Sequence, residues 1–180
     1  MKIRHCFFSL FLTISIISPS HALSDKQWAN ISDVGAYSLV GTSLLWPVIE
    51  NDWRGLREAS LSIGTATAIT QLGKALIHKQ RPDNSDNKSF PSGHTSFAFA
   101  SATNLYLRNG WEVGVPAYAL AALTGGARVG AKKHFWIDVV AGAAVGAGSA
   151  WIFTDAKNDN VRLLPWVEHK GGGVLIAMRW

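Results

Sequence analysis

The chain has 180 residues, a formal net charge of +5 at pH 7, one cysteine and a mean hydropathy near neutral. This length fits one domain with a hydrophobic core and is too short for two of ordinary size. The basic residues are scattered, with no run of five or six, which argues against a nucleic-acid-binding protein and leaves no nucleic acid among the expected partners. The single cysteine, Cys6, excludes a disulfide framework.

Residues 1–22 have the features of a secretory signal peptide. A basic start precedes an apolar stretch from Cys6 to Ile17, and Ser20, His21 and Ala22 form a small-x-small pattern. We expect cleavage after Ala22, which would leave a mature domain of residues 23–180 in the periplasm. The alternative is an uncharged anchor helix that stays attached, although the apolar stretch is shorter than the about 20 residues that span a bilayer.

The mature chain divides into five apolar stretches rich in Ala, Gly, Ser and Thr, each bounded by Trp, Pro, Gly or charged residues. Such stretches predict helices, and their small residues permit close helix packing. The predicted fold is therefore all-α, a compact bundle of about five to six helices. The stretches are residues 34–49, 59–77, 95–107, 113–127 and 137–153.

The location of this bundle has two interpretations, of which we prefer the first. Each stretch is short for a membrane span and several contain polar residues, which favours a soluble protein or one that is peripheral on the membrane. Tryptophans at the ends of the stretches are typical of a membrane interface and favour an integral inner-membrane protein with a periplasm-facing site. These tryptophans are Trp46, Trp53, Trp111, Trp136 and Trp151.

The last residues change character. Gly171, Gly172 and Gly173 separate two short runs of residues that favour strands, which predicts a short β-hairpin-like tail. Such a tail could cover an apolar helix face.

The first polar cluster is the sequence "KALIHKQRP" at the end of the second stretch. Lys74 and Arg81 are seven residues apart, two helical turns, and so share one face. Pro82 disfavours helix at Arg81 and frees that side chain to point into a loop. In isolation the pair would be interpreted as solvent-exposed cations near a helix end.

The second cluster is "PSGH", immediately before the third stretch. Ser92 is a good N-cap, and Gly93 lets the backbone approach a ligand closely. His94 would then lie beside free backbone N–H groups and the positive end of the helix dipole, which attract anions. The alternative is an ordinary capped turn with a surface histidine.

The third cluster is "GARVGAKKHFWID", which supplies Arg128, His134 and Asp138. If a helix begins near His134, Asp138 lies one turn along and can accept a hydrogen bond from one imidazole nitrogen. The other nitrogen is then unprotonated and directed, as in an activated histidine. The alternative is an ordinary surface pair.

Together the clusters supply three cations, helix-start amides and two histidines. This set suits a tetrahedral oxyanion, because the equatorial oxygens of a phosphoryl group carry negative charge that must be neutralised during transfer. The histidine and carboxylate spacing lacks an HExxH or paired-aspartate pattern, so we expect no metal and no cofactor.

The three motifs resemble those of the type 2 phosphatidic acid phosphatase (PAP2) superfamily, which includes bacterial class A acid phosphatases and vanadium haloperoxidases. They match that family's pattern in order and internal spacing from Lys74 to Asp138. One departure is Ala127, where the family usually has serine, and it removes one possible hydroxyl contact.

The resemblance implies a role for each motif residue. His134 would attack phosphorus and form a phosphohistidine, with Asp138 holding its imidazole. His94 would protonate the leaving oxygen and later help to activate water. The phosphate oxygens would be bound by Lys74, Arg81, Ser92, Gly93 and Arg128.

The predicted function is that of a metal-independent phosphatase acting on a phosphomonoester or pyrophosphate, with a lipid phosphate as the preferred substrate and the membrane surface as a possible partner. A soluble periplasmic acid phosphatase that takes small phosphate esters is the alternative. A vanadium haloperoxidase and a catalytically inactive membrane component are further alternatives with less support.

Overall fold

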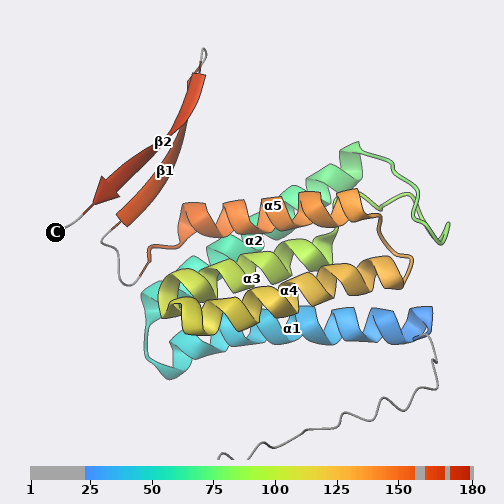
Figure 1. Ribbon diagram of the computed structural model, residues 1–180, viewed down its shortest axis with the longest axis horizontal. Coiled ribbons are helices and arrows are strands. Elements are labelled where there is room, and N and C mark those ends of the chain that lie inside the picture. The colour runs from blue at the N-terminus through green and yellow to red at the C-terminus, as the bar shows by residue number, and fades with distance from the viewer. Residues whose placement is uncertain (1–22, 157–160, 169–170, 179–180) are drawn as a thin grey trace, which may run out of the picture.

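The computed structural model describes residues 23–156, 161–168 and 171–178, and the side chains of residues 23–156. The predicted signal peptide lies outside the described residues. Helices form in all five predicted stretches, which confirms the all-α class with five helices (Figure 1). They are α1 (Asp25–Ile49), α2 (Trp53–Leu76), α3 (Gly93–Asn109), α4 (Trp111–Gly130) and α5 (Trp136–Phe153).

All five helices begin before the predicted apolar stretches, and α1 and α2 do so by the most residues because polar residues cap them. At α1, the Ser24 hydroxyl accepts a hydrogen bond from the Gln27 backbone N–H at 3.3 Å, and the Gln27 side chain accepts one from the Ser24 backbone at 2.8 Å. At α2, the Asp52 carboxylate accepts from the Gly55 backbone N–H at 2.9 Å. Reciprocal caps of this kind satisfy amides that have no partner within the helix.

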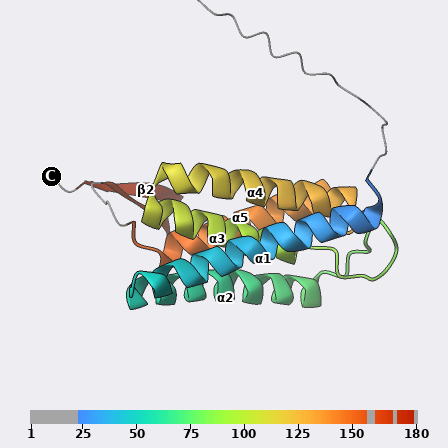
Figure 2. The ribbon, with the colours of Figure 1, turned by 90° about the horizontal axis from the view of Figure 1, so that it is seen from below.

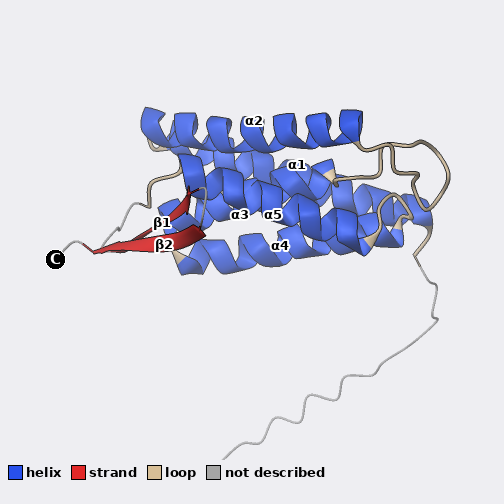
Figure 3. Cartoon of the chain, turned by 90° about the horizontal axis from the view of Figure 1, so that it is seen from above, coloured by secondary structure: helices blue, strands red, loops and turns tan. Residues whose placement is uncertain are grey.

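The helices run in alternating directions, and α3 packs against all four of the others. Figures 2 and 3 show α2 and α4 on opposite sides of the bundle, with the other helices between them. This arrangement brings the start of α1, the α2–α3 loop and the α4–α5 loop to one end of the bundle, at the right of Figure 1. The three predicted polar clusters lie at this end.

Small residues let α5 approach the start of α3. A Cβ atom on Gly142 would lie 2.5 Å from the carbonyl oxygen of Ser92, and one on Gly146 would lie 2.0 Å from that of Ser96. Both contacts are too close for any side chain, so glycine is required at these positions. The packing fixes the PSGH segment against the helix that follows His134.

The chain after α5 contains β1 (Val161–Glu168) and β2 (Gly171–Met178), which pair antiparallel from Val161 opposite Met178 to Glu168 opposite Gly171. No side chain of residues 157–180 is described. Neither the predicted hairpin-like tail nor its packing on a helix face is therefore confirmed.

The contact between α3 and α5 predicts a difference between two glycines of the same helix. Gly146→Ala should lower the melting temperature in detergent, because overpacking against backbone costs about 1–3 kcal/mol. Gly148→Ala is the matched control, since a Cβ there meets nothing within 4 Å. Equal melting temperatures for the two variants, measured by thermal unfolding, would contradict this packing.

Candidate active site

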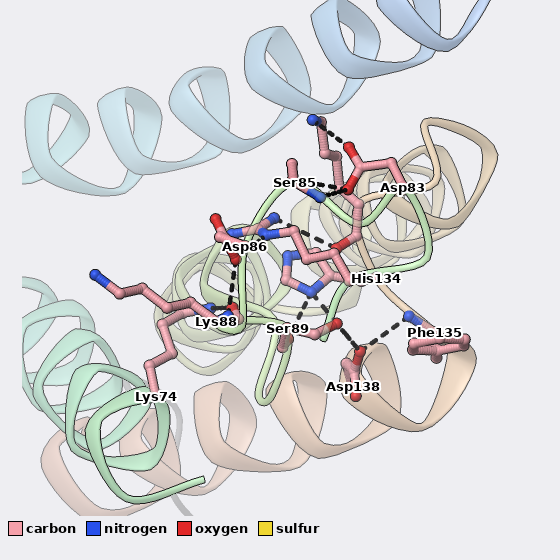
Figure 4. Close-up of polar contacts among 11 residues, drawn as sticks. Lys74, Asp83, Ser85, Asp86, Lys88, Ser89, His134, Phe135 and Asp138 are labelled. Atoms are coloured by element: carbon pink, nitrogen blue, oxygen red, sulfur yellow. Dashed lines mark hydrogen bonds and ion pairs between the residues drawn. The ribbon is translucent and has the colours of Figure 1, made fainter. Parts of the chain in front are cut away.

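His134 lies in the α4–α5 loop and is almost completely buried. Its Nδ1 is 2.7 Å from the carbonyl oxygen of Ser89 (Figure 4). A carbonyl can only accept, so Nδ1 carries the proton and Nε2 keeps an unprotonated lone pair. Burial, together with the nearby charges of Arg128, Lys74 and Arg81, lowers the pKa of His134 to about 3. The imidazole is therefore neutral at pH 7 and has a free nitrogen.

Asp138 does not make the predicted hydrogen bond to His134, because its nearer carboxylate oxygen lies 3.9 Å from Nδ1. That carboxylate instead accepts from Lys79 Nζ at 2.6 Å, the Ser89 hydroxyl at 2.6 Å and the Phe135 backbone N–H at 2.9 Å. The direct bond was predicted from a helix beginning near His134. The helix begins at Trp136, so Asp138 caps its first turn and is connected to His134 through the hydrogen bonds of Ser89.

Ser89 and Lys79 were not singled out from the sequence. Ser89 is fully buried and uses two groups, its carbonyl toward His134 and its hydroxyl toward Asp138. The Lys79 ammonium also lies 4.5 Å from the centre of the Phe135 ring. Lys79 occupies an unspecified position between Lys74 and Arg81 of the first motif, and Ser89 lies between the first and second motifs, so no spacing rule marks either residue.

Lys74 and Arg81 are each held by the α2–α3 loop. Lys74 Nζ donates to the Lys88 carbonyl at 2.7 Å (Figure 4). Arg81 Nε donates to Asp86 at 2.7 Å, and its Nη1 donates to the Lys133 carbonyl at 3.3 Å. The guanidinium of Arg81 thus connects the loop before α3 to the loop before α5.

An ion pair also joins these two loops. Lys133 Nζ lies 2.5 Å from the Asp83 carboxylate, which also accepts from the Ser85 hydroxyl at 2.7 Å. These donors hold the pKa of Asp83 well below its usual range. The loops that carry Arg81 and His134 are therefore fixed relative to each other.

Arg128 is buried near the end of α4. Its Nη1 donates to the Ser32 hydroxyl at 3.2 Å and lies 3.5 Å from the Asp33 carboxylate. Its Nε is buried and has no hydrogen-bond partner among the described residues. An oxygen of a bound oxyanion would supply that missing acceptor.

The PSGH segment begins α3 as predicted, with Ser92 at the N-cap position. The Ser92 hydroxyl pairs with the Thr95 hydroxyl at 2.9 Å, and its backbone N–H donates to the Asp138 carbonyl at 3.0 Å. A Cβ on Gly93 would be 3.9 Å from Lys74 Cε, so the backbone here faces the lysine side chain. The first amides of α3 have no acceptor within the helix and can bind an anion.

His94 follows at the second position of α3 and is about one quarter exposed. Its Nε2 lies 3.0 Å from Asp33 of α1, a partner that the sequence did not indicate. Arg128, Arg81 and Lys74 act electrostatically on both His94 and His134. The structure thus brings all three predicted clusters together at one end of the bundle.

This arrangement defines a class of protein. Three cations, free helix amides and a neutral histidine with an unprotonated Nε2 suit nucleophilic attack on a phosphoryl group. Within residues 23–156, no cluster of three or more His, Cys, Asp or Glu side chains could hold a metal ion.

The comparisons with known proteins identify the family. Residues 55–162 match the model of the PAP2 superfamily. The chain is also 32% identical over 168 residues to a lipid A 4'-phosphatase of Helicobacter pylori, covering 85% of this chain and 83% of that protein. The chain belongs to the PAP2 superfamily and is a PAP2-type phosphatase.

A second relative matches a shorter region of the chain. A lipid A 1-phosphatase of Porphyromonas gingivalis is 37% identical over 91 residues, which are 48% of this chain and 20% of that protein.

Two solved structures share the fold at 25% identity. Aquifex aeolicus LpxE has a TM-score of 0.62 over 71% of this chain and 83% of that one. A transmembrane PAP2 type phosphatidylglycerolphosphate phosphatase of Bacillus subtilis has a TM-score of 0.58 over 72% and 74%.

Proposed function

We propose that this protein hydrolyses the phosphate group of a membrane lipid through a phosphohistidine on His134, with its site at the periplasmic face. The observation that carries the proposal is the hydrogen bond from His134 Nδ1 to the Ser89 carbonyl, which leaves Nε2 unprotonated among three cations. The family relationship supports phosphatase chemistry, and the names of the relatives support a lipid A phosphate as the substrate class.

In the first step, the lone pair of His134 Nε2 forms a bond to phosphorus. The bond from phosphorus to the leaving oxygen breaks, and its electron pair stays on that oxygen. His94 gives this oxygen a proton, so the lipid leaves as an alcohol. Lys74, Arg81 and Arg128, with the Gly93 and His94 amides, neutralise the phosphoryl oxygens.

In the second step, water replaces the histidine. His94 has lost its proton and now takes one from water, whose oxygen forms a bond to phosphorus. The bond between phosphorus and Nε2 breaks, and its electron pair returns to His134. Inorganic phosphate leaves, and both histidines regain their starting protonation states.

The surface of the bundle supports a membrane location. Five helical segments contain no Asp, Glu, Lys, Arg or His. At 1.5 Å per residue each segment is about 20–24 Å long, while the hydrocarbon core of a bilayer is about 30 Å thick. Large aliphatic side chains of four helices are more than half exposed within these segments, a pattern that suits lipid contact. They include Val34, Leu45, Leu72, Val115 and Val140. The segments are residues 34–49, 59–73, 95–107, 113–127 and 139–153.

Charged residues gather at the two ends of the bundle. At the end opposite the site, Arg108 forms ion pairs with Glu58 and Asp52, and Arg54 pairs with Glu58. Trp46, Trp53, Trp111 and Trp151 lie toward this same end, as interface aromatics do. By length and composition, one described helix, α5, is a candidate to cross a membrane by itself.

The proposed orientation of the bundle in the membrane rests on the basic and apolar sequence of the predicted signal peptide. Basic residues before an apolar stretch stay on the cytoplasmic side, so the chain that follows the stretch begins on the outer side. The first described helix, α1, begins at Asp25, at the end of the bundle that carries the site. The uncharged segments and the tryptophans favour an integral protein over a soluble acid phosphatase, and the orientation of α1 favours a periplasm-facing site.

Removal of the proposed nucleophile tests the mechanism. His134→Ala should lower phosphate release from lipid A in detergent micelles by more than about 10³-fold, because no other described group replaces Nε2. Rapid alkaline quenching with ³²P-labelled lipid A should leave label on the wild-type protein and none on the variant.

His78→Ala is the matched control, since His78 is exposed on the same α2–α3 segment and should keep full activity. Full activity in His134→Ala would refute the mechanism. Wild-type hydrolysis of a small chromogenic ester without hydrolysis of lipid A or phosphatidic acid would favour the soluble acid phosphatase.

The proposed orientation predicts which end of the bundle is accessible from outside. In a Cys6→Ser background, Ser85→Cys in the α2–α3 loop should react with a membrane-impermeant maleimide on spheroplasts. Glu112→Cys at the opposite end should react only after detergent lysis. Both side chains are exposed in the structure, so accessibility differs only through the membrane. The reverse labelling pattern, or release of the protein by high salt, would contradict the orientation or the embedding.

A further inference from the structure

Helix α1 lies outside residues 55–162 that match the family model, yet it contributes directly to the site. Asp33 Oδ1 lies 3.0 Å from His94 Nε2 and 3.5 Å from Arg128 Nη1. The preceding residue, Ser32, accepts a hydrogen bond from Arg128. A carboxylate is therefore built into an otherwise cationic pocket.

Two aromatic rings, which also stack on each other, contact the imidazole of His94. Tyr37, one turn along α1 from Asp33, meets the imidazole edge to face with 5.9 Å between ring centres. Phe97, on α3, lies 5.2 Å from it. These contacts hold the ring so that Nε2 faces α1, while Nδ1 has no hydrogen-bond partner among the described residues.

We propose that Asp33 is the positioning residue of His94, and that it accepts a hydrogen bond from Nε2 so that Nδ1 exchanges the proton with the leaving oxygen and with water. This inference rests on the proposed role of His94 as the general acid.

The charges around His94 give the carboxylate a further task. Burial disfavours a positive imidazolium at His94, and so do the charges of Arg128 on α4, Arg81 in the α2–α3 loop and Lys74 on α2. Tyr37 faces the imidazole from α1 as an aromatic ring. A general acid must be protonated when the lipid leaves, and Asp33 supplies negative charge that favours this state.

The test separates charge from geometry. Asp33→Asn keeps an acceptor for Nε2–H and removes the charge. It should lower kcat for lipid A hydrolysis about ten- to hundredfold with little change in KM, and move the alkaline limb of the kcat profile about one pH unit lower. The limb moves down because, without the carboxylate, His94 loses its proton at lower pH. Asp33→Glu should restore the limb and part of kcat.

Asp25→Asn is the matched control, because Asp25 is on the same helix and pairs with Lys132, 3.1 Å away. It should leave kcat and the pH profile unchanged. A ¹⁵N-histidine NMR titration gives a second readout that needs no turnover: His94 should titrate at lower pH in Asp33→Asn than in the wild type and in Asp25→Asn.

The outcomes distinguish this inference from the proposed function. An inactive His94→Ala together with an Asp33→Asn variant of unchanged kcat, pH profile and His94 titration would overturn the role of Asp33 alone. A change in KM without a change in kcat would also overturn it, and would assign Asp33 to substrate binding through Arg128. Full activity in His94→Ala would instead refute the acid assignment of the proposed function.

Discussion

The hydrogen bond between His134 Nδ1 and the Ser89 carbonyl is the interaction on which the chemistry of this site depends. It fixes the tautomer of a buried imidazole and leaves Nε2 as the free nitrogen. The Ser89 carbonyl is itself held because its hydroxyl donates to Asp138. Since that carboxylate also caps α5 and pairs with Lys79, the geometry of His134 is tied to the start of a helix.

The fold stabilises a site in which positive charge is concentrated. Three cations near one point repel each other, and carboxylates placed around them offset this repulsion: Asp86 holds Arg81, and Asp33 approaches Arg128. The close glycine contacts between α5 and α3 then hold the first turn of α3 against the helix that follows His134. Alternating short-looped helices place these parts, which are distant in sequence, at one end of the bundle.

The sequence could predict the helices and the motif residues because both leave local signals. Apolar stretches indicate helices. Lys74, Ser92, Arg128 and their neighbours stand at the spacings of the PAP2 motifs. The partners of the histidines leave no such signal, because they are set by packing between separate helices. Asp33 has no sequence feature that distinguishes it from other acidic residues of α1. Ser89 accepts the hydrogen bond of His134 through its backbone carbonyl oxygen, a group that every residue carries. The expected bond between Asp138 and His134 assumed a helix that begins near His134, whereas α5 begins two residues later, at Trp136.

The most direct test of this account is an experimental structure of the wild-type protein with orthovanadate, a tetrahedral mimic of phosphate. The account predicts vanadium bonded to Nε2 of His134, with Nδ1 still donating to the Ser89 carbonyl and the vanadate oxygens contacting Lys74, Arg81 and Arg128. Vanadium on Nδ1 of His134, on another residue, or held without any bond to this imidazole would contradict it.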